Sequence, residues 1–157
     1  MRSNGPEIMA AKKRKKPLSS SWARDVPNTS VHPLHVFSPR AEAALAKIRA
    51  ICKDLDGAIE KVSHGAPWFF ATKGFLAFYE DHHGDERLAI WVRGGDGAAG
   101  MLVQSDPTRF FVPPYVGKSG WFGMRLDRGK TDWAMVRELV TDGFYAAGGK
   151  SRKTGAP

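Results

Sequence analysis

Apolar residues recur at spacings of three and four between residues 41 and 55, which places them on one face of a helix. Ser38, just before this stretch, is a favourable N-cap residue, and Pro39 fits the first helical position. Gly57 ends the pattern, as glycine commonly does at a helix C-terminus. Cys52 falls on the apolar face, so we expect a buried thiol rather than a nucleophile.

Beyond residue 57 apolar and polar positions alternate, a period of two that is typical of β-strands. Five stretches with this pattern are expected to be strands: 59–62, 68–71, 75–79, 87–93 and 121–126. A hairpin turn at Thr72-Lys73-Gly74 joins the second of them to the third. Residues 98–105 predict a short helix, and a last helix begins near Thr131 or Asp132. Short hairpin connections favour an α+β fold, with an antiparallel sheet and helices packed on one face.

Alternation within the strands also predicts which side chains point away from the helices. The core set of the 87–93 strand is Leu88, Ile90 and Val92. Trp91 and Arg93 then lie on the opposite face, as do Trp121 and Arg125 of the 121–126 strand. An indole beside a guanidinium forms a stacking platform, worth about 1–3 kcal/mol per stacked base in single-strand binders.

Lys73, Arg109 and Lys118 are further candidates for binding an anion, although each is equally well explained as a surface charge. The predicted platform has an alternative as well. Tryptophans on a second sheet face are often covered by a helix or another subunit, with arginine at the rim. The sequence leaves both interpretations open.

The net charge of +8 is unevenly distributed along the 157 residues. Length and composition predict one folded domain at 38–147, flanked by basic, disordered tails at 1–37 and 148–157. The first tail has seven basic and two acidic residues and the second has three basic residues, whereas the domain has 14 of each sign. The folded body therefore lacks the overall basicity of a dedicated DNA-binding domain.

A run of five basic residues stands out in the first tail: Lys12, Lys13, Arg14, Lys15 and Lys16. Such runs are typical of nuclear localisation signals and of polyanion-binding patches. A solubilising leader or a start-site artefact explains the run equally well. If all five charges contacted duplex DNA phosphates, log affinity would fall with log salt at a slope of about −4.5.

The sequence contains no recognisable catalytic set, and we expect no metal and no cofactor. His82-His83 lacks metal-ligand spacing, and no residue near His64 completes a catalytic triad. The single cysteine excludes an internal disulfide, which favours a cytoplasmic location. No apolar run approaches the roughly 20 residues needed to span a membrane, and we expect no secretory signal, because residues 1–37 lack an apolar segment before a small-residue cleavage site.

Several motifs, in their order and spacing over residues 38–147, resemble the MmcQ/YjbR-like family of small bacterial proteins. They are Gly65-Ala66-Pro67-Trp68-Phe69, then Lys73 and Arg93, then Asp106-Pro107-Thr108-Arg109-Phe110, Pro113-Pro114-Tyr115-Val116-Gly117 with Gly120-Trp121, and Phe144-Tyr145. The resemblance implies an α+β fold similar to type III secretion chaperones. Members are commonly labelled DNA-binding, a label that rests on fold analogy.

The expected function is therefore that of a non-enzymatic domain that binds nucleic acid weakly. Its candidate site residues are Lys73, Trp91, Arg93, Lys118, Trp121 and Arg125, with the Lys12–Lys16 run supplying much of the electrostatic attraction. The alternative is a protein-interaction or small-ligand module that uses the Trp91/Trp121 face. In that case the partner is a small molecule, another protein or a second copy of the chain.

Overall fold

A computed structural model describes residues 35–150 of the chain. The Lys12–Lys16 run lies outside these residues, so its role in polyanion binding stays a prediction. The same holds for the proposed domain boundaries and for the disorder expected of the two tails.

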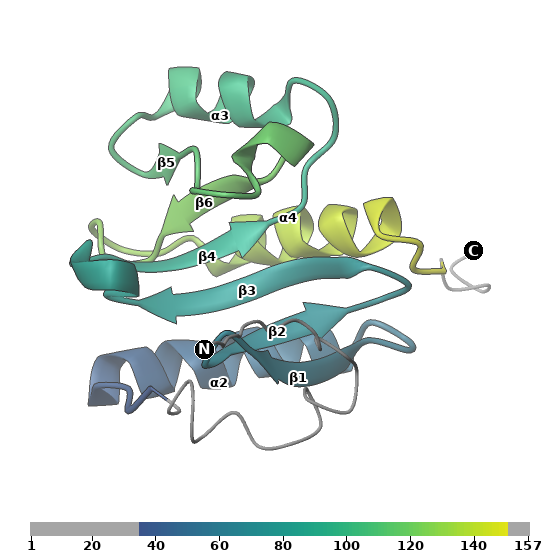
Figure 1. The fold of residues 1–157 in the computed structure, drawn as a ribbon, viewed down its shortest axis with the longest axis horizontal. Coiled ribbons are helices and arrows are strands. Elements are labelled where there is room, and N and C mark those ends of the chain that lie inside the picture. The colour runs from purple at the N-terminus through teal and green to yellow at the C-terminus, as the bar shows by residue number, and fades with distance from the viewer. Residues whose placement is uncertain (1–34, 151–157) are drawn as a thin grey trace, which may run out of the picture. The chain divides into compact units, whose positions relative to one another are not determined.

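A six-stranded antiparallel sheet and three α-helices make up the described part of the chain (Figure 1). The helices are α2 (Pro39–Lys53), α3 (Ala98–Ser105) and α4 (Trp133–Ala146). The strands are β1 (Ile59–Ser63), β2 (Ala66–Phe70), β3 (Gly74–Glu80), β4 (Leu88–Val92), β5 (Phe110–Phe111) and β6 (Phe122–Arg125). Their order across the sheet is β1-β2-β3-β4-β6-β5. The predicted α+β fold is confirmed.

Local capping chemistry fixes the starts of α2 and α4 where the sequence predicts them. The Ser38 hydroxyl accepts a hydrogen bond from the Ala41 N–H at 3.2 Å. The Asp132 carboxylate accepts from the N–H groups of Ala134 and Met135, both at 3.1 Å. These bonds satisfy N–H groups that have no partner within a helix.

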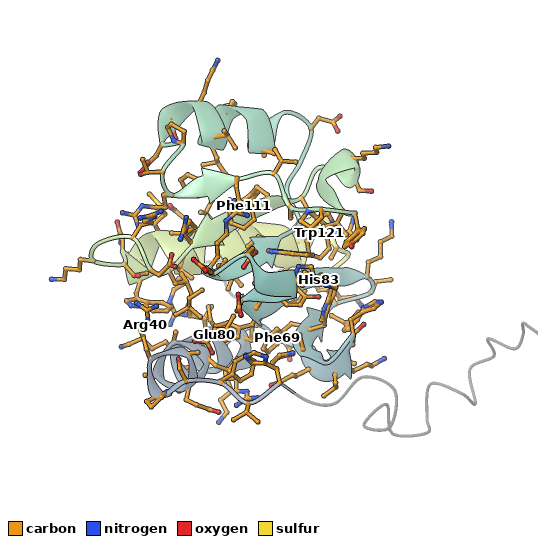
Figure 2. All side chains as sticks on the ribbon, turned by 60° about the vertical axis from the view of Figure 1, so that its left-hand side comes forward. Arg40, Phe69, Glu80, His83, Phe111 and Trp121 are labelled. Carbon is orange, nitrogen blue, oxygen red and sulfur yellow. The ribbon has the colours of Figure 1, made fainter. Side chains whose placement is uncertain are left out.

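Ser38 also joins α2 to the sheet. Its N–H and its hydroxyl donate to the two carboxylate oxygens of Glu80, at 2.9 and 2.6 Å. Glu80 ends β3 and lies beside the start of α2 (Figure 2). The first turn of the helix is thereby fixed to a central strand.

The two residues of β5 are not among the strands predicted from the sequence. Phe110 and Phe111 pair with Met124 and Gly123 of β6. A two-residue strand has no period of its own, so only its partner defines it. Two short 3₁₀ turns, η2 (His82–Gly84) and η3 (Gly117–Ser119), complete the described elements.

Two apolar clusters lie on opposite faces of the sheet. The larger contains buried side chains of α2 and α4, half-buried ones of α3, and the predicted core set of β4: Leu88, Ile90 and Val92. The second cluster consists of five buried residues, Ala66, Ala77, Tyr79, Trp91 and Trp121. The predicted division of β4 into two faces is therefore correct. None of the helices between residues 35 and 150 is long and apolar enough to cross a membrane.

Candidate functional site

Three aromatic rings form a continuous row on the face of the sheet that carries the second cluster. Trp68 and Phe70 lie two apart on β2, so their side chains share a face, and their ring centroids are 6.4 Å apart with an interplanar angle of 29°. The Trp68 ring also lies 5.5 Å from that of Trp121, which precedes β6. We call these three residues the aromatic row.

A cation lies over each end of the aromatic row. The ammonium of Lys61, on β1, is 5.1 Å from the centre of the Phe70 ring. The guanidinium of Arg93, just after β4, is 5.4 Å from the centre of the Trp121 ring. Both distances lie within the range in which a cation is attracted to an aromatic face. The predicted neighbours Arg93 and Trp121 are thus brought together.

Hydrogen bonds and a glycine hold the row in place. The Trp68 indole N–H donates to the Tyr79 hydroxyl at 3.1 Å, and Arg93 Nε donates to the Gly74 carbonyl at 2.8 Å. A Cβ on Gly74 would lie 3.2 Å from the Phe70 ring and 3.5 Å from the Trp68 ring. The absence of a side chain at Gly74 therefore leaves room for both rings beside the β2–β3 turn.

The row is partly open to solvent. Trp68 and Phe70 are half-buried, Lys61 is exposed, and only Trp121 is buried. Lys73 is exposed in the turn between β2 and β3, where its backbone N–H donates to the Ala147 carbonyl at 3.0 Å. This end of the sheet therefore offers aromatic surface next to two exposed lysines, a combination that suits a planar group carrying negative charge.

Trp91 does not extend this open surface, because its side chain is only 2% exposed, and Trp121 is 3% exposed. Tyr79 and His82 lie against the Trp91 ring, with centroids 4.4 and 4.8 Å away. Half-buried Phe111 and Val116 pack on the same cluster. Trp91 is thus covered by side chains of β3, η2, β5 and the segment before η3, all from the chain itself.

Neither of the other two candidate residues, Arg125 and Lys118, lies over a ring of the row within the described part of the chain. Arg125 donates to both carboxylate oxygens of Asp127, at 2.9 and 3.1 Å, so its charge is already paired. Lys118 is exposed on η3. The Gly120 carbonyl at the end of η3 accepts from the Gly94 N–H at 3.2 Å, which brings this turn next to the residue that follows Arg93.

Three histidines, His64, His82 and His83, lie at the end of β3 opposite the Lys73 turn. Burial, with a contribution from His83, lowers the pKa of His82, and the two rings are 4.1 Å apart. His64 lies within 3.0 Å of the Ser63 hydroxyl through Nδ1. Within residues 35–150, no three His, Cys, Asp or Glu side chains come together in an arrangement that could hold a metal ion.

Three members of the site, Lys61, Trp68 and Phe70, were not among the residues predicted from sequence. The same alternation that sorted β4 and β6 would have placed Trp68 and Phe70 on one face of β2. Lys61 is opposite Trp68 in the β1–β2 register, and that register depends on where the turn at His64-Gly65 falls. The sequence pattern was therefore sufficient to predict that Trp68 and Phe70 share a face. Placing Lys61 beside them required the register between β1 and β2.

Comparison with models of protein families agrees with the sequence-based resemblance. The family model YjbR matches residues 53–145, which is more than half of the chain. Among solved structures, the chain is similar to the crystal structure of the Deinococcus radiodurans protein DR2400, family-model domain DUF419. The identity is 18% and the TM-score 0.49, over 61% of this chain and 72% of that one. A search of curated proteins finds no match.

Proposed function

The chain belongs to the YjbR family, and we propose that it binds single-stranded nucleic acid weakly at the aromatic row. The observation that carries this proposal is the row itself. In space, the rings follow one another in the order Phe70, Trp68 and Trp121, and the cations of Lys61 and Arg93 lie at the two ends. Proteins that bind single strands combine aromatic rings, on which bases stack, with cations along the backbone path.

Each part of the row has a role in this proposal. The half-buried rings of Trp68 and Phe70 supply the stacking surface, because they are the members that solvent reaches. Lys61, which lies over the Phe70 ring, and Lys73, in the turn that follows β2, are both exposed and contact phosphates in this proposal. Arg93, whose Nε is held by the Gly74 carbonyl, contributes a fixed positive charge behind the rings.

The neutral charge of residues 38–147 makes the affinity of the row alone weak. The Lys12–Lys16 run supplies most of the long-range attraction in our proposal, since phosphate neutralisation dominates affinity for nucleic acid. The Lys12–Lys16 run and the aromatic row should differ in how their contributions to affinity depend on salt. The tail sets the salt dependence, and the row contributes stacking that salt affects little.

The other expected function, a binding module built on the Trp91/Trp121 face, has less support. It needs accessible indoles, and both side chains are buried beneath other parts of the chain. We therefore place ligand contact at Trp68 and Phe70.

Fluorescence anisotropy with a labelled oligo-dT at two salt concentrations tests the proposal on the full chain. Trp68→Leu should weaken binding about tenfold at both salts, since losing one stacked base costs about 1–3 kcal/mol. Lys61→Gln and Lys73→Gln should each weaken it at low salt. Lys53→Gln is the matched control, because Lys53 is an exposed lysine at the end of α2 and outside the row.

A second variant, with all five residues of the Lys12–Lys16 run changed to glutamine, tests the tail separately. The slope of log affinity against log salt should become shallower by about 3.5, the value for five contacts on a single strand. Unchanged affinity of Trp68→Leu and Lys61→Gln would show that the row is not the site. An unchanged slope in the tail variant would exclude the tail.

A further inference from the structure

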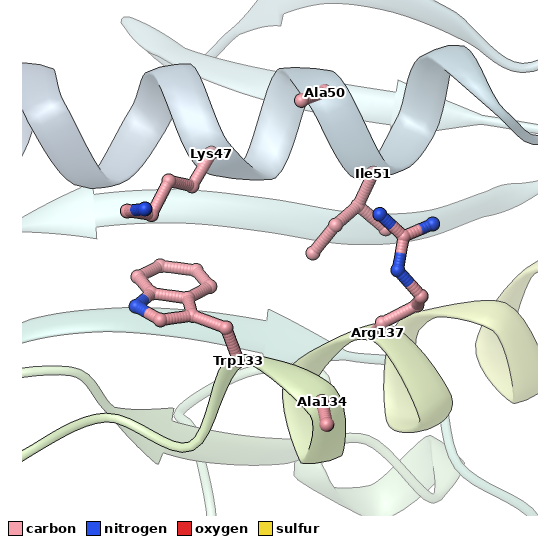
Figure 3. A pocket seen from close by; sticks show the side chains of 6 residues that line it. All are labelled: Lys47, Ala50, Ile51, Trp133, Ala134 and Arg137. Atoms are coloured by element: carbon pink, nitrogen blue, oxygen red, sulfur yellow. The ribbon is translucent and has the colours of Figure 1, made fainter.

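A groove lies between α2 and α4, on the helical side of the sheet and away from the aromatic row (Figure 3). Its volume is about 310 Å³, at the lower end of the range for small-molecule sites. Six residues line it, three from each helix: Lys47, Ala50 and Ile51 of α2, and Trp133, Ala134 and Arg137 of α4.

Three of the residues that line the groove are apolar and small or buried. Ala50 and Ala134 stand on its two walls, and both are exposed. Ile51 is buried and points into the space between the helices, so it forms an apolar floor. Both alanines border the groove, so a larger side chain at either position would extend from its rim and narrow the opening.

Charged side chains border the groove, but only one of them lacks an ionic partner. Arg137 Nη1 is 3.0 Å from the Asp54 carboxylate, so its charge is paired. The ammonium of Lys47 lies 5.7 Å from the centre of the Trp133 ring. In the part of the chain that the structure describes, no carboxylate lies within ion-pair distance of Lys47. Lys47 is thus the cation available to a ligand.

We propose that this groove binds a small organic anion with an aromatic body. The ring of the ligand lies on Ile51 between the two alanines and against Trp133, and its acid group pairs with the Lys47 ammonium. One ligand reaches both contacts because Lys47 and Trp133 are already neighbours. The basic tails of the chain are unsuitable occupants, because their charge has the same sign as Lys47 and Arg137.

Titration of the full chain with 8-anilinonaphthalene-1-sulfonate, an aromatic sulfonate, tests this proposal. Wild type should bind one equivalent saturably. Lys47→Gln should weaken binding at least fivefold by removing the charge, and Ala134→Leu should do so by filling the groove. The indole N–H resonance of Trp133, assigned with Trp133→Phe, should shift on titration of the wild type.

Two matched variants control for general effects of charge and bulk. Lys53→Gln removes an exposed lysine from the same helix, and Ala146→Leu adds the same bulk at an exposed position near the end of α4. Both should bind the probe within twofold of wild type. If Ala134→Leu lowers the urea midpoint, Ala50→Leu blocks the groove from the other helix.

The proposal fails if Lys47→Gln and the groove-filling variants bind the probe within twofold of wild type. It also fails if Lys53→Gln and Ala146→Leu weaken binding of the probe as much as Lys47→Gln and the groove-filling variants do. Absence of saturable binding to wild type would overturn it as well. The proposal is independent of the nucleic-acid proposal, since Lys47→Gln should leave oligonucleotide affinity unchanged.

Discussion

The ring of Phe111 occupies the space that a side chain on Gly123 would need. The two residues are directly opposite each other in the β5–β6 pair, and a Cβ built on Gly123 would overlap three carbons of the Phe111 ring. The guanidinium of Arg87 lies on the ring as well, 4.0 Å from its centre. Phe111 is thus packed on the sheet at Gly123 and helps to cover the second cluster.

Replacing Gly123 by alanine should therefore destabilise the protein. A glycine inside a strand is less stable than an alanine by about 0.5–1 kcal/mol, so without any steric overlap Gly123→Ala would raise the free energy of unfolding by that amount. The overlap with Phe111 outweighs this gain, because overpacking a filled site typically costs about 1–3 kcal/mol. Urea unfolding of Gly123→Ala should show a net loss of stability.

The double variant Gly123→Ala/Phe111→Ala identifies the cause. Removing the ring should make the alanine at position 123 neutral or stabilising relative to Phe111→Ala alone. If Gly123→Ala costs the same amount in both backgrounds, the overlap with Phe111 is not the reason for the glycine.

Local patterns predicted the elements well, because each helix and each of the longer strands has a period of its own. Leu88, Ile90 and Val92 were assigned to the helical face from alternation alone, and the structure has them there. The pair Phe110-Phe111 was missed since two residues have no period. Register with β6 makes it a strand.

The candidate site was harder to predict because covering and pairing are long-range properties. Alternation shows that Trp91 points away from the helices, but it contains no information about whether Tyr79, His82 and Phe111 will cover it. Similarly, Arg93 and Trp121 are 28 positions apart in sequence order and meet only because β4 pairs with β6. Correct sorting of faces thus identified residues of the second face without showing which of them solvent reaches.

The contact between Ser38 and Glu80 should contribute measurably to stability, because a carboxylate accepts two hydrogen bonds from one residue. Hydrogen bonds to charged groups are worth about 1.5–3 kcal/mol, and removing an N-cap serine costs about 0.5–2 kcal/mol. Glu80→Ala and Ser38→Ala should each lower the urea midpoint within these ranges. The double variant should lose at least about 0.5 kcal/mol less than the sum of the two. Strict additivity would mean that the bond from the Ser38 hydroxyl to Glu80 contributes nothing, since the bond from the backbone N–H remains in Ser38→Ala.

Cys52 should make the protein less stable as the solution becomes alkaline. Burial, with the charge of Glu60, raises the pKa of the thiol to about 12 in the folded state, whereas an unfolded cysteine ionises near about 8.5. Stability from this group is full below the unfolded pKa and is lost as pH rises toward the folded pKa. The advantage of wild type over Cys52→Ala should therefore shrink by about 1 kcal/mol between pH 8 and 9.5.

Urea unfolding of both proteins across this pH range provides the measurement. Other groups that titrate here affect both proteins alike, so the difference isolates the thiol. A difference that stays constant from pH 8 to 9.5 would show that the folded thiol ionises as readily as the unfolded one. Rapid labelling of the native protein by a thiol reagent at pH 8 would also contradict a raised pKa of the folded thiol, since the thiolate is the reactive form.

The contribution of Asp127 to stability should have the opposite pH dependence to that of Cys52: it is present at neutral pH and is lost as the solution becomes acidic. Burial alone would raise the pKa of its carboxyl, but hydrogen bonds from Arg125 and from the Leu88 N–H outweigh burial and lower the pKa below its ordinary value. Because the folded pKa is depressed, this contribution is present above the unfolded pKa of about 3.9 and is lost as pH falls through the folded pKa. Asp127→Asn should therefore cost about 1–3 kcal/mol at pH 7.

The pH dependence distinguishes this charge effect from a loss of packing. The stability difference between wild type and Asp127→Asn should narrow as the urea midpoint is followed from pH 7 to pH 3, because protonation removes the same charge that the substitution removes. Asp142→Asn is the control, as Asp142 is exposed on α4 and should show little difference at either pH. A difference for Asp127→Asn that is as large at pH 3 as at pH 7 would mean that shape, and not the paired charge, makes Asp127 stabilising.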